Sequence, residues 1–447
     1  MENYRKEKFI MANSEQYAGG ENFDLRHILV RGRELGLRER MEFFQDFLRS
    51  LGTDREALTL RQIATAADRQ VDVLDPHDGT KHMMLMFGSN NYLGLAHHPC
   101  VRARVEEAIR RYGTGLGGPP LLNGYTPLHR SLEERLAALK GTEDALLFSS
   151  GYGANAGVVS GLLNRKDIVL YDAYSHASFC DGLKLAGVQS LRFPHNDVGK
   201  LGSLLAENRG GTHDVFVGVE GVYSMDGDLA PLDAIVPLCK AHGALLILDD
   251  AHGTGVIGRT GRGTAEHFGV HGEIDATVGT FSKTLAVTGG FIAASKPVID
   301  YLRYFARSYM FSASLPPMVI AAVHAGLDVM EREPELLERL RENTRYAVQG
   351  FRSLGFDVKG DSPIIALRVP IGMNIRHAGQ EFHRRGIFVN SIEYPAVPVS
   401  QQRFRISMMA AHTRSDIDAL LTAVKEVWEA FAARDLATVP EEMALAS

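Results

Sequence analysis

The sequence predicts an α/β protein, in which a mostly parallel sheet of seven strands is covered by helices and a smaller α+β domain closes the chain. Two observations carry this prediction. Seven short apolar runs alternate with helix-length segments in the middle of the chain, as in successive βαβ units. After a long helical stretch that follows Pro317, three short strand-like runs lead into one more helix. In an open sheet of this kind, a ligand site lies at the carboxyl ends of the strands.

The first element is an amphipathic helix at residues 37–51, where Met41, Phe44, Phe47, Leu48 and Leu51 recur at helical spacing. We expect this helix to pack on the body or on a partner subunit, with contact to a membrane surface as the alternative. A polar arm precedes it. We expect an N-terminal arm and helix at 1–95, a large α/β domain at 96–335 and a small α+β domain at 336–447.

The predicted strands of the large sheet are bounded by turn residues and by segments with helical periodicity. They are residues 145–148, 168–171, 190–193, 215–219, 244–248, 276–280 and 290–294. Gly141 and Gly243 follow two of the helical segments, at the position where a C-cap is needed. A long helix after Pro317 breaks near Pro334. The C-terminal domain has predicted strands at 364–369, 387–391 and 403–408 and a helix at 415–432.

Composition excludes several classes of function. The 447 residues are 45% apolar and carry 48 basic against 54 acidic side chains, without blocks of like charge. This balance argues against nucleic acid or an anionic membrane as the main partner. The three cysteines are far apart, which fits a reducing cytoplasm and no metal site. No signal peptide or membrane-spanning stretch is present, so we expect a cytoplasmic protein with at most peripheral contact with the inner membrane.

Two strand ends carry residues suited to catalysis. Lys283 ends the segment DATVGTFSK, which delivers it to the carboxyl edge of the sheet. Partial desolvation there lowers the pKa of a lysine and suits Schiff-base chemistry. Asp249 ends the buried run in ALLILDDAHGTG, where a carboxylate is costly unless it meets a cation or several donors. A solvated lysine and a helix-capping aspartate are the alternatives, but the pairing of the two strand ends favours a site.

A lysine and a carboxylate placed in this way suit pyridoxal phosphate, which also needs a phosphate cradle and a group over its ring. In LLFSSGYGAN a strand and a turn lead into a helix start, where backbone N–H groups beside Ser150, Gly151 and Tyr152 suit a phosphate. YDAYSHAS is another strand end, from which His176 would cover the ring. The alternative is that Ser175 caps the next helix and His176 is an exposed histidine.

Taken together, an ordered series of motifs resembles the α-oxoamine synthases, which condense an amino acid with an acyl thioester. The series is FGSNNYLGL, NGYTPLHRSLE, SSGYGAN, YSHAS, EGVYSMDGD, LDDAHGTGVIG, GTFSK, GGFIA, ARSYMFSASLPP and RISMMAAHT. It runs from about residue 87 to residue 413, most of the chain. The resemblance implies the fold-type I pyridoxal phosphate architecture. The segments SPIIALRV and GIFVNSIEYPAVP are most similar to the bacterial serine palmitoyltransferase branch.

The resemblance also implies a role for each matching residue. Lys283 would form the Schiff base and act as general base, Asp249 would pair with the pyridine nitrogen, and His176 would stack on the ring. His252 would bond the phenolic oxygen. Further cofactor contacts would come from Ser150, Gly151, Tyr152, Ser224, Thr280 and Ser282. Ser312 would reach the phosphate from a neighbouring subunit, which implies a homodimer with shared active sites. Arg405 would bind the amino-acid carboxylate, with Asn90 nearby.

The implied reaction joins an amino acid, L-serine by this branch, to a long-chain acyl-CoA and releases carbon dioxide, free CoA and 3-ketodihydrosphingosine. One departure bears on substrate choice: Pro119 and Pro120 stand where many relatives carry Ser-Arg. Three alternatives within the family therefore stay open. They are 8-amino-7-oxononanoate synthase, 2-amino-3-ketobutyrate CoA ligase and a synthase fed by an acyl carrier protein. Residues 311–323, FSASLPPMVIAAV, would line an acyl channel or belong to the core.

Two readings from other classes compete with a synthase. Gly113, Gly115 and Gly118 have the spacing of a dinucleotide-binding motif, but they follow an apparent helix and run into two prolines. A non-catalytic subunit with the same fold is the second rival. Such a subunit would lack the Schiff-base lysine, whereas Lys283, Asp249 and His176 are all present here.

Overall fold

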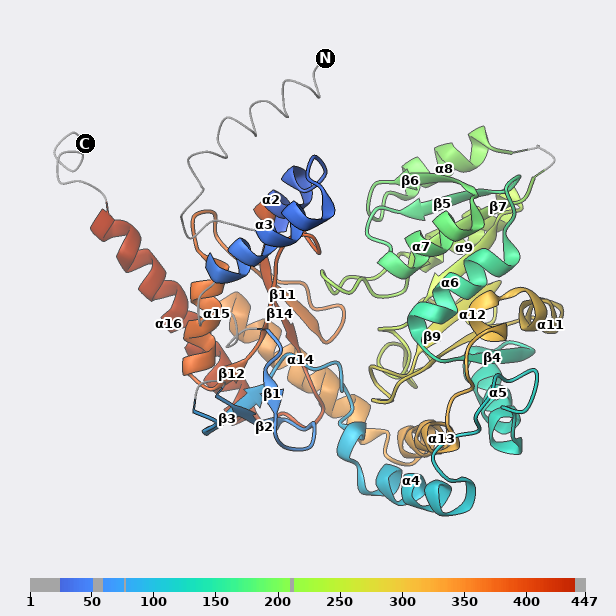
Figure 1. Cartoon of the computed structure of the whole chain (residues 1–447), viewed down its shortest axis with the longest axis horizontal. Helices are drawn as coiled ribbons and strands as arrows, with labels where there is room; N and C mark the ends of the chain where they lie inside the picture. Colours follow the sequence, from blue (N-terminus) through green and yellow to red (C-terminus); the bar gives the residue numbers. More distant parts are fainter. Residues whose placement is uncertain (1–24, 51–58, 76–77, 210–212, 439–447) are drawn as a thin grey trace.

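The computed structural model describes residues 25–50, 59–75, 78–209 and 213–438 (Figure 1). The polar arm predicted at the start of the chain lies largely outside these residues, as does Leu51. Strands form three separate sheets of seven, four and three strands. In Figure 1 the seven-stranded sheet and its helices form one body, and the C-terminal sheet with α16 (Arg414–Thr438) lies in the other.

The seven-stranded sheet confirms all seven predicted strands. Their order is β4-β10-β9-β8-β7-β5-β6. β10 runs antiparallel to both of its neighbours, and the remaining ladders are parallel. The strands are β4 (Asp144–Phe148), β5 (Ile168–Asp172), β6 (Gln189–Phe193), β7 (Val215–Glu220), β8 (Leu245–Asp249), β9 (Ala276–Thr280) and β10 (Gly290–Ala294).

Helices cover both faces of this sheet because its strands are apolar on both sides. Leu246 and Leu248 of β8 pack in one core cluster, while Ile247 packs in another on the opposite face. One face carries α6 (Gly151–Leu162), α7 (Ala177–Ala186) and α11 (Lys296–Phe305). The other carries α5 (Pro127–Lys140), α8 (Val198–Glu207) and α9 (Leu232–His242). As predicted, Gly141 and Gly243 end α5 and α9 in the left-handed region, with φ of 69° and 65°.

The C-terminal part differs from its prediction at one strand and in the helix at 375–384, which was not predicted. The run 387–391 is split between β12 (Ile387–Phe388), which pairs with β3, and β13 (Asn390–Ile392), which pairs with β14. A single apolar run supplies two short strands because the chain passes from one sheet to the next. The other elements are α13 (Pro317–Arg332), α14 (Glu335–Ser353), β11 (Ile364–Arg368), α15 (Ile375–Arg384), the short 3-10 turn η4 (Val399–Gln401) and β14 (Arg403–Ser407).

N-terminal strands join the C-terminal part through the four-stranded sheet β1-β2-β3-β12. The early elements are α2 (Leu25–Arg31), α3 (Leu37–Ser50), β1 (Gln62–Ile63), β2 (Gln70–Leu74), β3 (Lys81–Met86), η3 (Leu95–His97) and α4 (Pro99–Tyr112). Two short helices, α10 (Thr264–His267) and α12 (Arg307–Met310), complete the described fold. The division of the chain at 95 and 335 stays a prediction.

The amphipathic helix α3 has the predicted extent but is only partly covered. Phe47 is buried, and the guanidinium of Arg376 lies 5.6 Å from the centre of its ring. Leu37 and Met41 stay 62% and 59% exposed. Packing on the body is therefore confirmed for one side chain of the stripe.

The segment after α12 belongs mainly to the core. Leu315, Ile320 and Val323 are buried in the hydrophobic cluster that also holds Phe281 and Phe291. Of the two expectations for 311–323, the core is the one these side chains support.

A buried ion pair ties α5 to the loop after β8. Lys140 Nζ donates to Asp250 Oδ2 at 2.7 Å and to the carbonyl of Arg262 at 2.7 Å. Both side chains are almost fully buried, at 3% and 1% exposed. We expect Lys140→Ala to lower the free energy of unfolding by about 3–5 kcal/mol, because it leaves the Asp250 carboxylate buried and unpaired. Urea unfolding measures this. Lys240→Ala, in an exposed pair with Glu273, is the control, and an equal loss in both variants would contradict the prediction.

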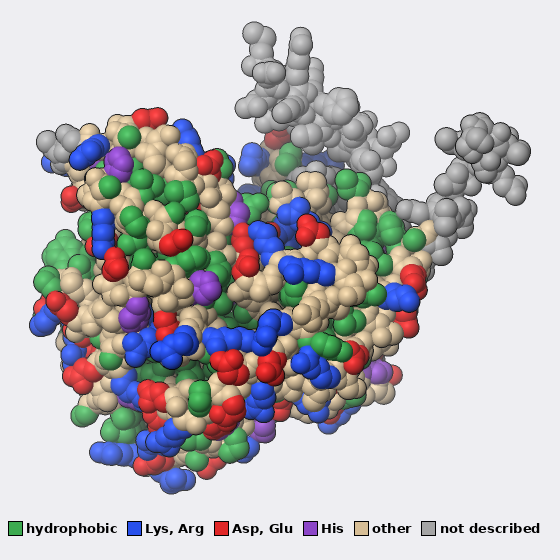
Figure 2. All heavy atoms as spheres, turned by 180° about the vertical axis from the view of Figure 1, so that it is seen from behind, with side chains coloured by type: hydrophobic (Ala, Val, Ile, Leu, Met, Phe, Trp, Pro, Cys, Tyr) green, Lys and Arg blue, Asp and Glu red, His purple; other side chains and the backbone are tan. Residues whose placement is uncertain are grey.

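On the face seen in Figure 2, basic and acidic side chains lie interspersed rather than in separate fields. Among the described residues, no helix combines the length and apolar character needed to cross a membrane.

Candidate active site

A cavity of about 270 Å³ opens at the carboxyl edge of the large sheet. Every residue predicted to contact the cofactor lines it, except Ser312. The lining comes from the ends of β7, β8 and β9 and from the starts of α6 and α7. Its residues are Ser150, Gly151, Tyr152, Asn155, His176, Ser178, Glu220, Ser224, Asp249, Ala251, His252, Val278, Gly279, Thr280, Ser282 and Lys283.

Lys283 follows β9 and lies among charged side chains of both signs. Burial lowers the pKa of Lys283 to about 8, and the positive charge of Arg405 acts in the same direction. The negative charge of the Asp249 carboxylate opposes this shift. An appreciable share of Lys283 is therefore the neutral amine near pH 7, as nucleophilic attack on an aldehyde requires.

Asp249 is the last residue of β8 and is 7% exposed. Its Oδ2 accepts a hydrogen bond from Asn155 Nδ2 at 2.6 Å, and its Oδ1 accepts one from the backbone N–H of Ala251 at 3.1 Å. Asn155 in turn donates to the hydroxyl of Ser178 at 3.0 Å. These donors hold the carboxylate in one orientation at the wall of the cavity.

Two histidines complete the cavity in their neutral form. Burial lowers the pKa of His252 well below its ordinary value, and the charges of Lys283 and Arg405 add to this. Its Nδ1 lies 2.8 Å from the Tyr92 hydroxyl. His176 is exposed at the cavity, as the alternative expected. Partial desolvation nevertheless lowers its pKa, and its Nδ1 accepts from the backbone N–H of Ser178 at 3.2 Å.

His176, not Ser175, therefore caps α7. The alternative in which Ser175 served as the cap is wrong. Its hydroxyl is buried and, in the described part of the chain, has no hydrogen-bond partner.

The start of α6 has the features of a phosphate site. Ser150 caps the helix by accepting from the backbone N–H of Gly153 at 2.9 Å. A Cβ at Gly151 would come within 2.8 Å of Thr280 Oγ1, so only glycine fits here. Thr280 and Ser282 bring their hydroxyls within 2.9 Å of each other at the same wall. Tyr152 turns its hydroxyl away, toward Asp181.

Arg405 and Asn90 meet beside this cavity, as the resemblance implied. Arg405 Nη1 donates to Asn90 Oδ1 and to the Ser407 hydroxyl at 3.0 Å each, and its Nε donates to the carbonyl of Ser224 at 2.6 Å. Arg405 is only 4% exposed. Among the described residues no carboxylate forms an ion pair with it, so a buried positive charge faces neutral oxygens alone.

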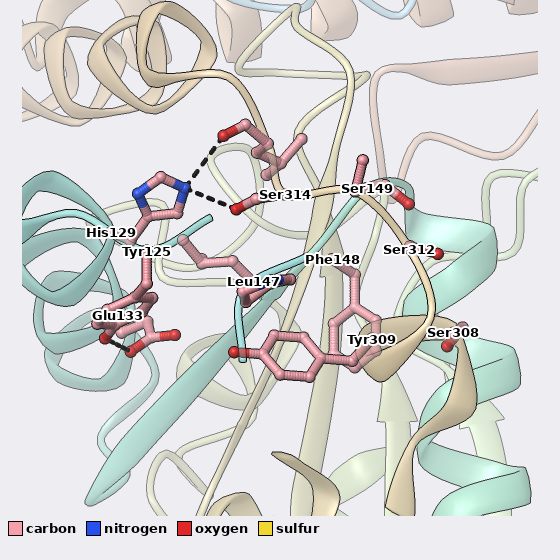
Figure 3. A pocket seen from close by; sticks show the side chains of 13 residues that line it. Tyr125, His129, Glu133, Leu147, Phe148, Ser149, Ser308, Tyr309, Ser312 and Ser314 are labelled. Atoms are coloured by element: carbon pink, nitrogen blue, oxygen red, sulfur yellow. Dashed lines mark hydrogen bonds between the residues drawn. The ribbon is translucent and has the colours of Figure 1, made fainter. Parts of the chain in front are cut away.

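Ser312 lies apart from these residues, in a small cavity of about 10 Å³ (Figure 3). His129 and Glu133 of α5 line the same cavity. Figure 3 shows the imidazole of His129 turned toward Ser314, at 3.1 Å, with Ser312 on the far side of the cavity. The role of Ser312 in a neighbouring subunit stays a prediction.

Several residues at the site carried no predicted role, among them Glu220, Asn155 and Tyr92. Glu220 ends β7 directly opposite Asp249 in the register. It is 4% exposed, and its Oε1 has no hydrogen-bond partner among the described residues. Burial and the negative charge of Asp249 raise the pKa of Glu220 well above its usual value, which favours the protonated carboxyl group. The strand-end rule that identified Asp249 would also have identified Glu220, because both terminate buried parallel strands.

The glycine cluster does not have the context of a dinucleotide site. Gly113 ends α4 with φ of 73°, and the segment after it is a loop that returns on itself. Within that loop the backbone N–H of Gly124 donates to the carbonyl of Pro119 at 3.0 Å. No helix begins at these glycines, whereas a dinucleotide-binding motif opens a helix. The fold therefore also argues against dinucleotide binding.

The residues present fit pyridoxal phosphate. They combine an amine with a lowered pKa, a fixed carboxylate on a neighbouring strand, and a helix N-terminus that admits no Cβ. The orphaned Oε1 of Glu220 is a further polar group that a ligand would meet. Fold and site together define a pyridoxal phosphate enzyme with the aminotransferase-like architecture.

Comparison with known proteins identifies the family within this class of pyridoxal phosphate enzymes. Residues 82–424 match the family described as aminotransferase class I and II. An 8-amino-7-oxononanoate synthase of Geobacter sulfurreducens is 44% identical over 77% of this chain and 88% of its own length. A serine palmitoyltransferase of Bacteriovorax stolpii is 41% identical over 78% of this chain and 83% of its own. The solved serine palmitoyltransferase of Sphingomonas wittichii superposes with a TM-score of 0.83 at 32% identity, covering 89% of this chain and all of that one.

The chain therefore belongs to the aminotransferase class I and II family, and within it to the relatives of the α-oxoamine synthases. Its cofactor is pyridoxal phosphate.

The rate at which the cofactor-free enzyme binds pyridoxal phosphate covalently should depend on the protonation state of Lys283. Only the neutral amine attacks the aldehyde, so the rate should rise with pH and level off above about pH 8. Stopped-flow absorbance between about pH 7 and pH 10 measures it, where the cofactor phosphate is already fully ionised. A rate that keeps rising toward the ordinary lysine pKa of about 10.4 would show that Lys283 is not desolvated.

Proposed function

We propose that this enzyme condenses L-serine with a long-chain acyl-CoA and releases carbon dioxide, free CoA and 3-ketodihydrosphingosine. The observation that carries the amino-acid part of this proposal is the uncompensated charge of Arg405. A guanidinium that is 4% exposed and bonded only to neutral oxygens suits a carboxylate supplied by the substrate.

The cofactor, when bound, supplies an electron sink that makes the Cα–H of the amino acid acidic. Residues of the chain do the rest. Arg405 holds the carboxylate of the amino acid until it leaves as carbon dioxide. Lys283 Nζ, with its lowered pKa, accepts the Cα proton. Asp249, fixed by Asn155, would keep the ring nitrogen of the cofactor protonated, and neutral His176 would cover the ring without adding charge.

The sequence motifs and the fold favour L-serine and a long acyl chain. The solved serine palmitoyltransferase covers 89% of this chain with a TM-score of 0.83. An 8-amino-7-oxononanoate synthase of Francisella tularensis superposes over 78% with a TM-score of 0.67. The second candidate is that synthase activity, with alanine and a dicarboxylic acyl donor. Its support is the 44% identity to the Geobacter enzyme.

A matrix of amino acids against acyl thioesters, scored by thiol release and product mass, tests the proposal. Serine, alanine and glycine should be combined with palmitoyl, pimeloyl and acetyl donors, each on CoA and on acyl carrier protein. We expect turnover with serine and palmitoyl-CoA. Turnover confined to alanine and the pimeloyl donor would replace the proposed substrates and leave the reaction class intact.

We further propose that the enzyme acts as a homodimer with shared active sites. Ser312 lies outside the main cavity, and three aromatic side chains in the segment that leads to it are exposed: Tyr304, Phe305 and Phe311. Exposed aromatic side chains of this kind suit contact with a second copy of the chain. Light scattering should give twice the chain mass, and a monomer that turns over at full rate would contradict the shared site.

A further inference from the structure

The loop at residues 222–229 joins the C-terminal sheet to the cofactor cavity. It leaves the end of β7, closes on itself through the bridge between Val222 and Leu229, and presents Ser224 at the cavity wall. Two arginines of β14 hold it. Arg405 Nε donates to the carbonyl of Ser224 at 2.6 Å, and Arg403 Nη1 donates to the carbonyl of Met225 at 3.2 Å.

Arg403 and Arg405 have different partners although both are buried on the same face of β14. Arg403 forms an ion pair with Asp226 at 2.6 Å, and its other nitrogens donate to the backbone and side chain of Gln401. Its charge is compensated within the protein. The charge of Arg405 is not compensated by any carboxylate among the described residues. The first arginine therefore has the features of an anchor, and the second those of a ligand-binding group.

We propose that Asp226 is a positioning residue for the substrate carboxylate: its ion pair with Arg403 fixes β14 against the 222–229 loop and so fixes the direction of the Arg405 guanidinium. This inference rests on the proposed role of Arg405. Arg403 lies two residues from Arg405 along β14, and Asp226 lies two residues from Ser224 along the loop. The ion pair between them therefore gives the strand and the loop a second contact, next to the hydrogen bond from Arg405 to the Ser224 carbonyl. Without it, Arg405 would keep its charge and lose its alignment.

The other flank of the loop provides a matched control. Asp228 accepts from Lys359 Nζ at 2.6 Å and lies 2.9 Å from His195 Nε2. Among the described residues its side chain forms no hydrogen bond or ion pair with β14, yet it is an aspartate of the same loop, with a similar degree of burial and an ion pair of its own. Damage to the loop in general should appear in Asp228→Asn as well as in Asp226→Asn.

The test compares two ligands that differ in one group, L-serine and 2-aminoethanol, which lacks the carboxylate. Their dissociation constants are measured on the holoenzyme from the change in cofactor absorbance, without an acyl donor. Asp226→Asn should weaken L-serine binding by about tenfold or more, the loss expected for a misaligned charge-assisted hydrogen bond, and should leave 2-aminoethanol within about twofold. Asp228→Asn should preserve the preference for L-serine, and Asp226→Glu should restore most of it.

Equal weakening of both ligands in Asp226→Asn, or an unchanged preference for L-serine, would overturn the inference. So would the same loss of preference in Asp228→Asn. If Asp226→Asn does not fold, Arg403→Lys replaces it, with the same expected loss of preference because the ammonium lacks the planar fork. Arg405→Lys separates the two proposals. A preference that survives in Arg405→Lys would refute the carboxylate site itself, whereas a preference lost there and kept in Asp226→Asn would refute only the positioning role.

Discussion

Replacement of Lys283 by alanine should reduce turnover by at least about 10⁴-fold, because the variant loses both the covalent link to the cofactor and the general base. The physical basis is the placement of one amine at the end of β9, where burial lowers its pKa to about 8. Alanine at this position leaves the cavity wall and the start of α6 in place. The cofactor should therefore still bind, although without a covalent bond.

Borohydride reduction followed by peptide mass analysis measures the link directly. The wild-type protein should carry the reduced cofactor on the peptide that contains Lys283, and the variant should carry none. Lys240→Ala, on the exposed surface of α9, should behave as the wild type. A modified lysine elsewhere in the chain, or full turnover in Lys283→Ala, would refute the assignment of the site.

Replacement of Asp249 by asparagine is the second change with a large expected effect. The amide keeps the size of the side chain and an oxygen for Asn155, but it removes the negative charge that favours a protonated ring nitrogen. We expect the rate constant to fall by about 10²–10³-fold, as when one preorganised electrostatic partner of a reaction centre is removed. The absorbance of the bound cofactor should change with it.

Glu220→Gln is the comparison for this variant, because Glu220 ends the neighbouring strand in register with Asp249. Burial and the charge of Asp249 raise the pKa of Glu220 well above its usual value, which favours its neutral form. An amide there preserves the charge of the site, and the rate should fall by less than about tenfold. A larger loss in Glu220→Gln than in Asp249→Asn would reverse the roles of the two carboxyl groups.

Much of the site was visible in the sequence because parallel strands end at a common edge. Asp249 ends a strand that apolar composition identifies, Lys283 follows another such strand, and the helix start after β4 follows a Ser-Gly turn. These are local signals, and each of these residues lines the cavity. Glu220 also ends a buried parallel strand, but the resemblance assigned a role only to Ser224 in the motif EGVYSMDGD.

Other features depended on contacts between distant segments. The sequence predicted Arg405 and Asn90 only through resemblance, since 315 residues separate them along the chain. That Arg405 lacks a carboxylate partner while Arg403 has one is decided by a loop that neither strand pattern nor spacing reveals. The division of 387–391 into two strands in two sheets is a similar case, because the pairing partner of a strand is set by the packing of the whole chain.

The sequence by itself determined the class of architecture, the seven strands of the large sheet and the lysine and aspartate at two of their ends. It did so because apolar periodicity and turn residues act over a few neighbours. Only the tertiary structure decided which buried charges are compensated. Asp250 compensates Lys140 and Asp226 compensates Arg403, whereas no carboxylate among the described residues pairs with Arg405. Compensation depends on distances of a few ångströms between segments far apart in the chain, and those distances exist only in the folded protein.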